Sequence, residues 1–253
     1  MIRLFLLSER QMARISPCFP LSHGVPRVDD RRVVSGIVYV IRNGLQRKDA
    51  PLGYGPHKTL YKPRHPLKPA RRLRPDLCGS RRRRAKARAH YDRRDPSEGT
   101  SHGSEPLEKR AVPRRIGRTK GGLNSKLHAV CNSEGKPLVL LLSEGQMSDH
   151  KGARLILEVL PPANALLADR GYDSNGFRAA LGKRGCEPCI PSTKSRKIPL
   201  PYDKALYKQR HKIENMFAKL KDWRRIATRY DRCAHTFFSA ICIAATVAFY
   251  LNQ

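Results

Sequence analysis

Apolar side chains in the first 62 residues recur at the spacing of one helix face. The clearest set is Val33, Val34, Ile37, Val38 and Ile41. Asp29-Asp30 can cap the start of this helix, and Gly44 stands just past its end, where glycine readily takes the left-handed conformation that closes a helix. Tyr54-Gly55-Pro56 then opens another helix. Residues 1–62 are therefore predicted to form a small helical domain.

The helical pattern stops at about residue 63. Prolines stand at positions 63, 66, 69, 75, 96 and 106, and four arginines follow one another at Arg81–Arg84. Apolar periodicity is almost absent from residues 63–112, so this basic segment is not expected to fold by itself. It is interpreted either as a nucleic-acid-binding tether or as a linker without a selected role.

An α/β pattern begins at about residue 113 and continues to residue 253. Strands are predicted at 125–131 and 138–143, joined by a hairpin through Asn132–Gly135, and at 165–168 and 187–190. Helices are predicted at 149–160, 174–184 and 203–223. The apolar run from His235 to Leu251 is short for a membrane span and lacks flanking positive anchors, so a buried closing helix is preferred to a transmembrane one.

The seven cysteines are scattered and odd in number, and no cleavable signal peptide precedes them. This usage predicts free thiols in a reducing cytoplasm. Cys186 and Cys189 form a C-x-x-C pair, but the sequence offers no second pair at ligand spacing. Two small residues at a strand end are therefore preferred to a zinc site.

The chain carries 51 Lys+Arg against 21 Asp+Glu, a formal net charge of +30. Such an excess indicates a polyanionic partner, most often nucleic acid. Basic side chains around the N-terminal helices make a helix-turn-helix-like DNA contact possible, and a plain packing domain remains the alternative.

Candidate chemistry gathers at two places in the α/β region. Asp169 follows a short apolar run, where reactive groups of open α/β sheets collect, although aspartate also ends strands and caps helices. Tyr207, Arg210, Glu214 and Lys221 fall on one side of a helix. Glu214 can complete a carboxylate site with Asp169, while Arg210 and Lys221 can bind phosphates. The alternative for the helix is an ordinary solvated face.

The tyrosine, arginine, glutamate and lysine pattern resembles the signature of insertion-sequence-4 and insertion-sequence-5 transposases, which are DDE enzymes with a ribonuclease-H-like fold. Further similar segments are Gly117–Leu123, Lys126–Ala129, Gly145–Asp149, Ala168–Asp173 and Lys221–Asp231. The N-terminal segments Gly24–Arg32 and Tyr54–Tyr61 are similar to the helical domain that precedes the catalytic core in the insertion-sequence-5 branch.

The resemblance implies metal-dependent DNA strand cleavage and transfer at transposon ends. Asp169 and Glu214 match the second and third carboxylates, which would hold Mg²⁺ or Mn²⁺, and Tyr207, Arg210 and Lys221 match the other active-site residues. The residues expected to contact DNA are Arg118, Lys120, Lys126, Arg210, Lys221, Arg224 and Arg225. The implied partner is double-stranded DNA with terminal inverted repeats, bound by a homodimer in the nucleoid of the cytoplasm and not at a membrane.

The first carboxylate of the family pattern is not evident. It should end an apolar strand upstream of Gly117, but Asp92 and Asp95 near that place have no preceding strand, and a proline follows Asp95. Codons that spell His90–Glu98, read one nucleotide later, can spell the apolar strand Ile-Met-Ile-Asp-Ala-Thr. We therefore hypothesise two compensating frameshifts that bound residues 63–111. A further departure is Arg47, where the family usually has an aromatic residue.

Four functions follow from these observations. The leading one is a transposase by descent whose catalysis is impaired in this chain, because the ribonuclease-H-like domain lacks its first strand and first carboxylate. The others are an active enzyme that uses Asp92 or Asp95, a non-catalytic DNA-binding remnant that occupies transposon ends, and a basic RNA-binding protein. The last of these leaves unexplained the helix face formed by Tyr207, Arg210, Glu214 and Lys221.

Overall fold

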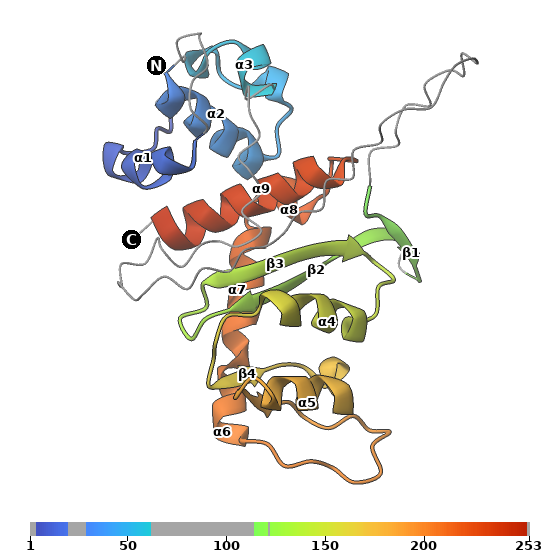
Figure 1. Ribbon diagram of the computed structural model, residues 1–253. Helices are drawn as coiled ribbons and strands as arrows, with labels where there is room; N and C mark the ends of the chain where they lie inside the picture. The colour runs from blue at the N-terminus through green and yellow to red at the C-terminus, as the bar shows by residue number, and fades with distance from the viewer. Residues whose placement is uncertain (1–3, 20–28, 62–113, 121, 252–253) are drawn as a thin grey trace, which may run out of the picture.

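The computed structural model describes residues 4–19, 29–61, 114–120 and 122–251 (Figure 1). The basic segment 63–112 lies outside these ranges, and so do Asp92, Asp95 and the strand expected to carry the first carboxylate.

Short helices form the described N-terminal part of the chain. They are α1 (Glu9–Ile15), η1 (Ser16–Cys18), α2 (Asp30–Asn43), η2 (Arg47–Asp49), η3 (Leu52–Tyr54) and α3 (His57–Tyr61). The carboxylate of Asp29 caps α2 by accepting the Arg32 N–H at 3.1 Å, and Gly44 ends the helix at φ 70°. The cap and the terminator foreseen in the sequence therefore both operate.

A three-stranded antiparallel sheet follows in the order β1 (Gly117–Thr119), β2 (Gly122–Cys131), β3 (Pro137–Glu144). The predicted hairpin joins β2 to β3. Its turn is held by the Asn132 side-chain oxygen, which accepts the N–H groups of Glu134 and Lys136 at 3.0 and 2.9 Å. Gly135 takes φ 78°, a conformation that side chains disfavour.

A smaller parallel pair holds β4 (Ala165–Leu167) beside β5 (Glu187–Cys189). The helices around it are α4 (Asp149–Val159) and α5 (Asn175–Gly182), capped by the hydroxyls of Ser148 and Ser174. Helix α4 lies along the hairpin in Figure 1, and α5 lies beside β4. The predicted α/β character is thus present, although the strands of the described residues form two sheets.

The predicted helix 203–223 is not uniform. It consists of α6 (Lys204–Tyr207), the 3₁₀ turn η6 (Lys208–Arg210) and α7 (His211–Lys221), and α8 (Arg224–Ala227) follows after a break. Helical spacing alone does not reveal this tightening, because α and 3₁₀ turns differ by only about half a residue per turn.

Two hydrophobic cores lie on opposite faces of the β2–β3 hairpin, because successive side chains of a strand point to opposite faces. Leu127 and Ala129 pack with the core formed by α7 and the C-terminal helix α9 (Ala234–Thr246). Val139 and Leu141 pack with the core of α4 and α5. The hairpin therefore couples the two halves of the α/β region.

The C-terminal apolar run forms α9 and one π-helical stretch, η7 (Val247–Leu251). Phe237, Ile241 and Ala245 are buried in the same core as Leu7 and Val38 of the N-terminal part. The predicted closing helix is therefore a core element shared with the first helices, and Figure 1 shows α9 between them and the sheet. Among the described residues, the run Ala234–Leu251 is long and apolar enough to cross a membrane, and half of it is buried.

Candidate active site

Asp169 lies two residues beyond the end of β4, on the turn that leads into η5 (Arg170–Tyr172). The backbone N–H of Tyr172 donates to the Asp169 carbonyl at 2.9 Å, which closes this turn. The Asp169 side chain is 54% exposed. It therefore stands at the carboxyl end of a parallel strand and is accessible from solvent, as expected for a reactive carboxylate.

Arg210 joins Asp169 to Glu214. One guanidinium nitrogen lies 2.8 Å from Asp169 Oδ1 and the other lies 2.5 Å from Glu214 Oε1. Arg210 ends η6 and Glu214 lies four residues later in α7, the spacing at which side chains on one helix meet. Two carboxylates from distant parts of the sequence thus share a single cation.

Tyr207 completes this cluster. Its hydroxyl donates to Asp169 Oδ1 at 3.4 Å, and its ring packs edge-on against Tyr202, with the centroids 5.4 Å apart. Burial raises the pKa of the Tyr207 hydroxyl, and the nearby Asp169 carboxylate adds to this while Arg210 opposes it. Tyr207 is therefore a neutral hydrogen-bond donor at neutral pH.

Lys221 lies apart from the cluster. It is the last residue of α7, exposed and seven residues beyond Glu214, which corresponds to about 10 Å along a helix. The structure therefore brings Tyr207, Arg210 and Glu214 to Asp169 but leaves Lys221 at a distance, where it can reach a different part of a long ligand.

The other predicted DNA contacts are divided between exposed and engaged side chains. Arg118, Lys120 and Arg224 are exposed. Lys126 donates to Asp149 Oδ1 at 3.2 Å and to the Met147 carbonyl at 2.9 Å. These bonds orient its ammonium toward the start of α4.

Arg225 has a structural role that differs from its predicted DNA contact. It is 12% exposed, its guanidinium pairs with Asp231 at 2.8 Å, and it donates to the Leu45 carbonyl at 2.7 Å. The bond to Leu45 ties α8 to the loop after α2. Charge in a sequence does not indicate burial, which is why this role was not foreseen.

Sequence reasoning also missed a series of hydrogen bonds behind Asp169, the polar line, which joins the side chains of Tyr172, His128 and Ser143. The Tyr172 hydroxyl turns inward to His128 Nδ1 at 3.3 Å, and His128 Nε2 lies 3.2 Å from the Ser143 hydroxyl. Gly152 makes room for the ring, since a Cβ there would come within 2.5 Å of His128 Cε1. The strand that carries His128 and the turn that carries Asp169 are joined by this line.

Both titratable members of the line are held neutral. Burial lowers the pKa of His128, and the Lys126 ammonium adds to this while Asp149 opposes it. Burial raises the pKa of Tyr172 to about 12, with further contributions from Asp149 and Asp169. The line is therefore a set of neutral hydrogen bonds near neutral pH.

Asp173 anchors the other side of the same turn. Its fully buried carboxylate accepts from Arg178 Nε at 2.7 Å, from Arg196 at 2.9 and 3.0 Å and from the Thr193 N–H at 2.8 Å. Burial alone would raise the pKa of this carboxyl, but the bonds from Arg196, Thr193 and Arg178 hold it well below its usual range. The sequence of Ala168–Asp173 did not indicate that Asp173 would be a buried anchor.

The pair formed by Asp169 and Glu214 suits a hard divalent cation. Mg²⁺ commonly takes one or two carboxylates together with water and substrate phosphates, and both side chains are more than half exposed. Arg210 already shows that one cation can serve both. Within the described ranges, no group of three or more His, Cys, Asp or Glu side chains is arranged to hold a metal.

Cys186 and Cys189 are buried free thiols, and burial raises the pKa of each.

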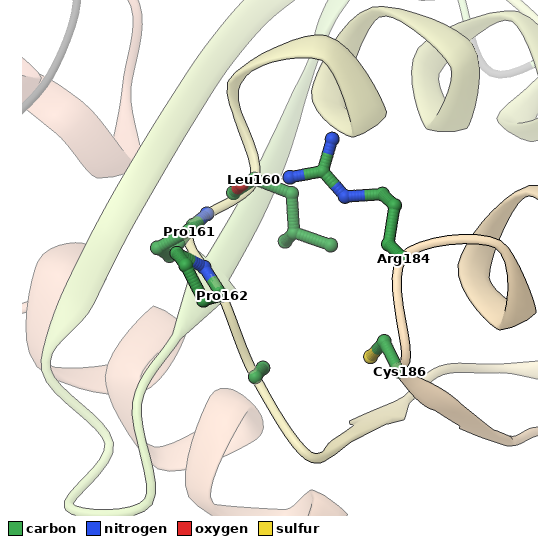
Figure 2. A pocket seen from close by; sticks show the side chains of 6 residues that line it. Leu160, Pro161, Pro162, Arg184 and Cys186 are labelled. Atoms are coloured by element: carbon green, nitrogen blue, oxygen red, sulfur yellow. Dashed lines mark hydrogen bonds between the residues drawn. The ribbon is translucent and has the colours of Figure 1, made fainter. Parts of the chain in front are cut away.

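A shallow cavity of about 270 Å³ lies elsewhere, lined by Leu160, Pro161, Pro162, Ala163, Arg184 and Cys186 (Figure 2). Arg184 donates to the carbonyls of Leu157 and Leu160 at 3.0 and 2.5 Å. Arg184 thereby satisfies backbone carbonyls at the C-terminal end of α4, so the cavity is a feature of helix packing.

Residues 95–248, more than half of the chain, match the family described as the transposase DDE domain. The chain belongs to the DDE transposase family. The family implies a ribonuclease-H-like fold, consistent with the mixed α/β structure. Residues 7–67 match a second description, transposase of the IS4/5 family, so residues 68–94 lie between the two matches of this transposase.

Two relatives support this assignment. The chain is 33% identical over 128 residues to a protein from Brucella ovis named as a transposase for insertion sequence element IS6501, covering 49% of this chain and 97% of the relative. It is 32% identical over 140 residues to one from Burkholderia cepacia named for IS402, covering 48% of this chain and 64% of the relative. No solved structure matches the chain.

Proposed function

We propose that this transposase descends from an enzyme that cleaves and joins DNA strands at transposon ends, with Asp169 and Glu214 as metal-binding carboxylates. The observation that carries the proposal is the Arg210 guanidinium, which lies within 2.8 Å of Asp169 and 2.5 Å of Glu214. A cation is thus already shared by the two carboxylates that the family pattern assigns to metal.

A bound Mg²⁺ or Mn²⁺ would supply activation of the attacking hydroxyl and stabilisation of the leaving oxygen. The protein's own side chains bind and orient the DNA. Tyr207 donates to Asp169 at 3.4 Å. Arg210 is close enough to exchange its carboxylate partners for a phosphate, since guanidinium binds both through the same fork. Lys221, farther along α7, is suited to a second phosphate of the same strand.

The same proposal includes impaired catalysis. Asp169 and Glu214 are two carboxylates, and the candidates for a third, Asp92 and Asp95, belong to the segment that the frameshift hypothesis assigns to a shifted frame. The two family matches leave residues 68–94 of that segment unmatched and cover its edges at residues 63–67 and 95–111.

The coding DNA from Leu60 to Arg114 tests this part directly. If the next frame spells an apolar strand ending in Asp-Ala-Thr, the chain is a damaged transposase and strand cleavage with Mg²⁺ or Mn²⁺ should be absent. If that frame is unrelated or interrupted by stops, impairment by frameshift is refuted. Cleavage that is lost in Asp92→Asn or Asp95→Asn would then identify the missing carboxylate.

A second candidate is a DNA-binding remnant that occupies transposon ends without cutting them. It is favoured by the exposed cations Arg118, Lys120 and Arg224, which do not depend on the carboxylate site. Binding to the terminal inverted repeats without cleavage, together with dimer formation on the repeat measured by sedimentation, would support it. Nucleoid association in cells is expected for either candidate.

A further inference from the structure

Residues 191–203 form a loop between β5 and α6 that projects from the body of the molecule (Figure 1). Its Lys194, Lys197 and Ile198 side chains are exposed, and Ile198 is 78% exposed. A loop with so little packing normally remains mobile, because few buried contacts offset the entropy lost on ordering. The defined conformation of this loop must therefore come from the hydrogen bonds and packing contacts that hold its two ends.

The first attachment is the buried carboxylate of Asp173. It accepts the Thr193 N–H at 2.8 Å and two guanidinium bonds from Arg196 at 2.9 and 3.0 Å. Arg196 also donates to the Asn175 side-chain oxygen at 2.8 Å. Because Asp173 is only four residues from Asp169, the beginning of the loop is fixed relative to the candidate active site.

The second attachment is at the far end of the loop. Asp203 caps α6 by accepting the N–H groups of Ala205 and Leu206 at 2.8 and 2.9 Å. Tyr202 packs against Tyr207, whose hydroxyl donates to Asp169. Within the loop, the Leu200 N–H donates to the Ser192 hydroxyl at 2.8 Å and brings the two arms together. Both ends are thus tied to residues that contact or adjoin Asp169.

The charge of this fixed loop points to its ligand. Lys194, Arg196 and Lys197 give three positive charges against the single negative charge of Asp203. Arg196 is bonded to Asp173, whereas Lys194 and Lys197 are exposed on the anchored loop. Lysines held in this way beside a phosphodiester-processing site suit the phosphate backbone of DNA.

We infer that the 191–203 loop is a DNA-contacting surface, in which Lys194 and Lys197 bind phosphates of the duplex engaged at Asp169 and Glu214, and Asp173 holds the loop in the binding position. This inference rests on the proposed DNA function. It adds a contact region that lies outside the helix face of Tyr207, Arg210 and Glu214.

The test is the salt dependence of binding to a fluorescently labelled, random-sequence duplex, measured by anisotropy on the full chain. The variant is Lys194→Gln with Lys197→Gln. The matched control is Lys48→Gln with Lys183→Gln, two exposed lysines on other elements. Each lost phosphate contact lowers the slope of log K against log salt by about 0.9, so the loop variant should lose about 1.8 and the control much less.

A charge-conserving variant tests the anchor separately. Arg196→Lys keeps the charge of the loop but loses the planar fork that bonds twice to Asp173. It should weaken DNA binding several-fold with the salt slope unchanged, and trypsin should cut at Lys194 and Lys197 faster than in the unchanged chain.

The outcomes separate the two proposals. If the unchanged chain binds DNA and the Lys194/Lys197 variant keeps the slope and affinity of the control, the loop inference is wrong and the proposed DNA function stands. If the unchanged chain does not bind DNA even at low salt, the proposed function itself fails, and the loop inference fails with it.

Discussion

Asp169 and Asp173 lie four residues apart on one turn and have opposite surroundings. The Asp169 side chain is 54% exposed and shares Arg210 with Glu214, whereas the Asp173 side chain is fully buried and is surrounded by Arg178, Arg196 and a backbone N–H. Burial makes a charge pair costly to break, and exposure leaves it exchangeable. The same residue type is thus an anchor at one position and an available ligand at the other.

The largest expected effect comes from removing the anchor. Asp173→Asn leaves Arg178 and Arg196 with an uncompensated buried charge and should reduce the free energy of unfolding by about 3–5 kcal/mol. Urea denaturation of this variant beside Asp169→Asn measures the contrast. The Asp169 variant should change stability by less than about 1 kcal/mol, and equal losses would show that the two aspartates are not different in kind.

The dependence of stability on pH tests the anchoring role of Asp173 in a second way. The bonds to Asp173 hold its folded pKa below the unfolded value of about 3.9. Its contribution to stability is therefore fully present above about pH 4 and is lost as the pH falls through the lowered folded pKa. The free energy of unfolding should fall more steeply below pH 4 in the unchanged chain than in Asp173→Asn. Parallel curves would assign the acid sensitivity to other carboxylates.

An intermediate loss of stability is expected when the hydrogen bond between Tyr172 and His128, behind the Asp169 turn, is removed. Tyr172→Phe removes the hydroxyl that meets His128 and leaves a buried ring nitrogen without that partner, at a cost of about 1–3 kcal/mol. Thermal unfolding gives the loss. The control Tyr230→Phe alters an exposed tyrosine and should be neutral, so a loss of similar size in both variants would argue against the buried line.

The smallest effect on stability is expected at the exposed pair, where ligand binding changes instead. Arg210→Gln should alter unfolding by less than about 1 kcal/mol. It should also strengthen Mn²⁺ binding, measured by titration calorimetry, because the internal cation no longer competes for Asp169 and Glu214. Arg118→Gln is the charge-matched control. Unchanged or weaker Mn²⁺ binding in Arg210→Gln would show that the guanidinium does not occupy the metal position.

The sequence predicted those parts of the structure that depend on local pattern. Alternation and turn residues gave the β2–β3 hairpin, and the periodicity around Val38 with its Gly44 terminator gave α2. Family spacing brought Glu214 to Asp169. The 3₁₀ turn at Lys208–Arg210 was missed because its side chains are compatible with either helix type.

The parts that could not be predicted depend on burial of polar groups. Asp173, His128 and Arg225 look like surface residues by type, and their partners are distant in sequence or lie on another element. Nothing in a single sequence indicates which of many arginines a buried aspartate will select. The carboxylate site of Asp169 and Glu214 was predicted because both residues belong to a motif, whereas the pairing of Arg210 with both of them and the buried contacts were not.

The shared core of α9 with the first helices has a consequence for biosynthesis. Leu7 and Val38 leave the ribosome long before Phe237 and Ile241, which cover them in the folded chain. The nascent N-terminal segment therefore exposes an apolar surface until α9 has been synthesised, and a product that stops before α9 would offer that surface to chaperones and proteases.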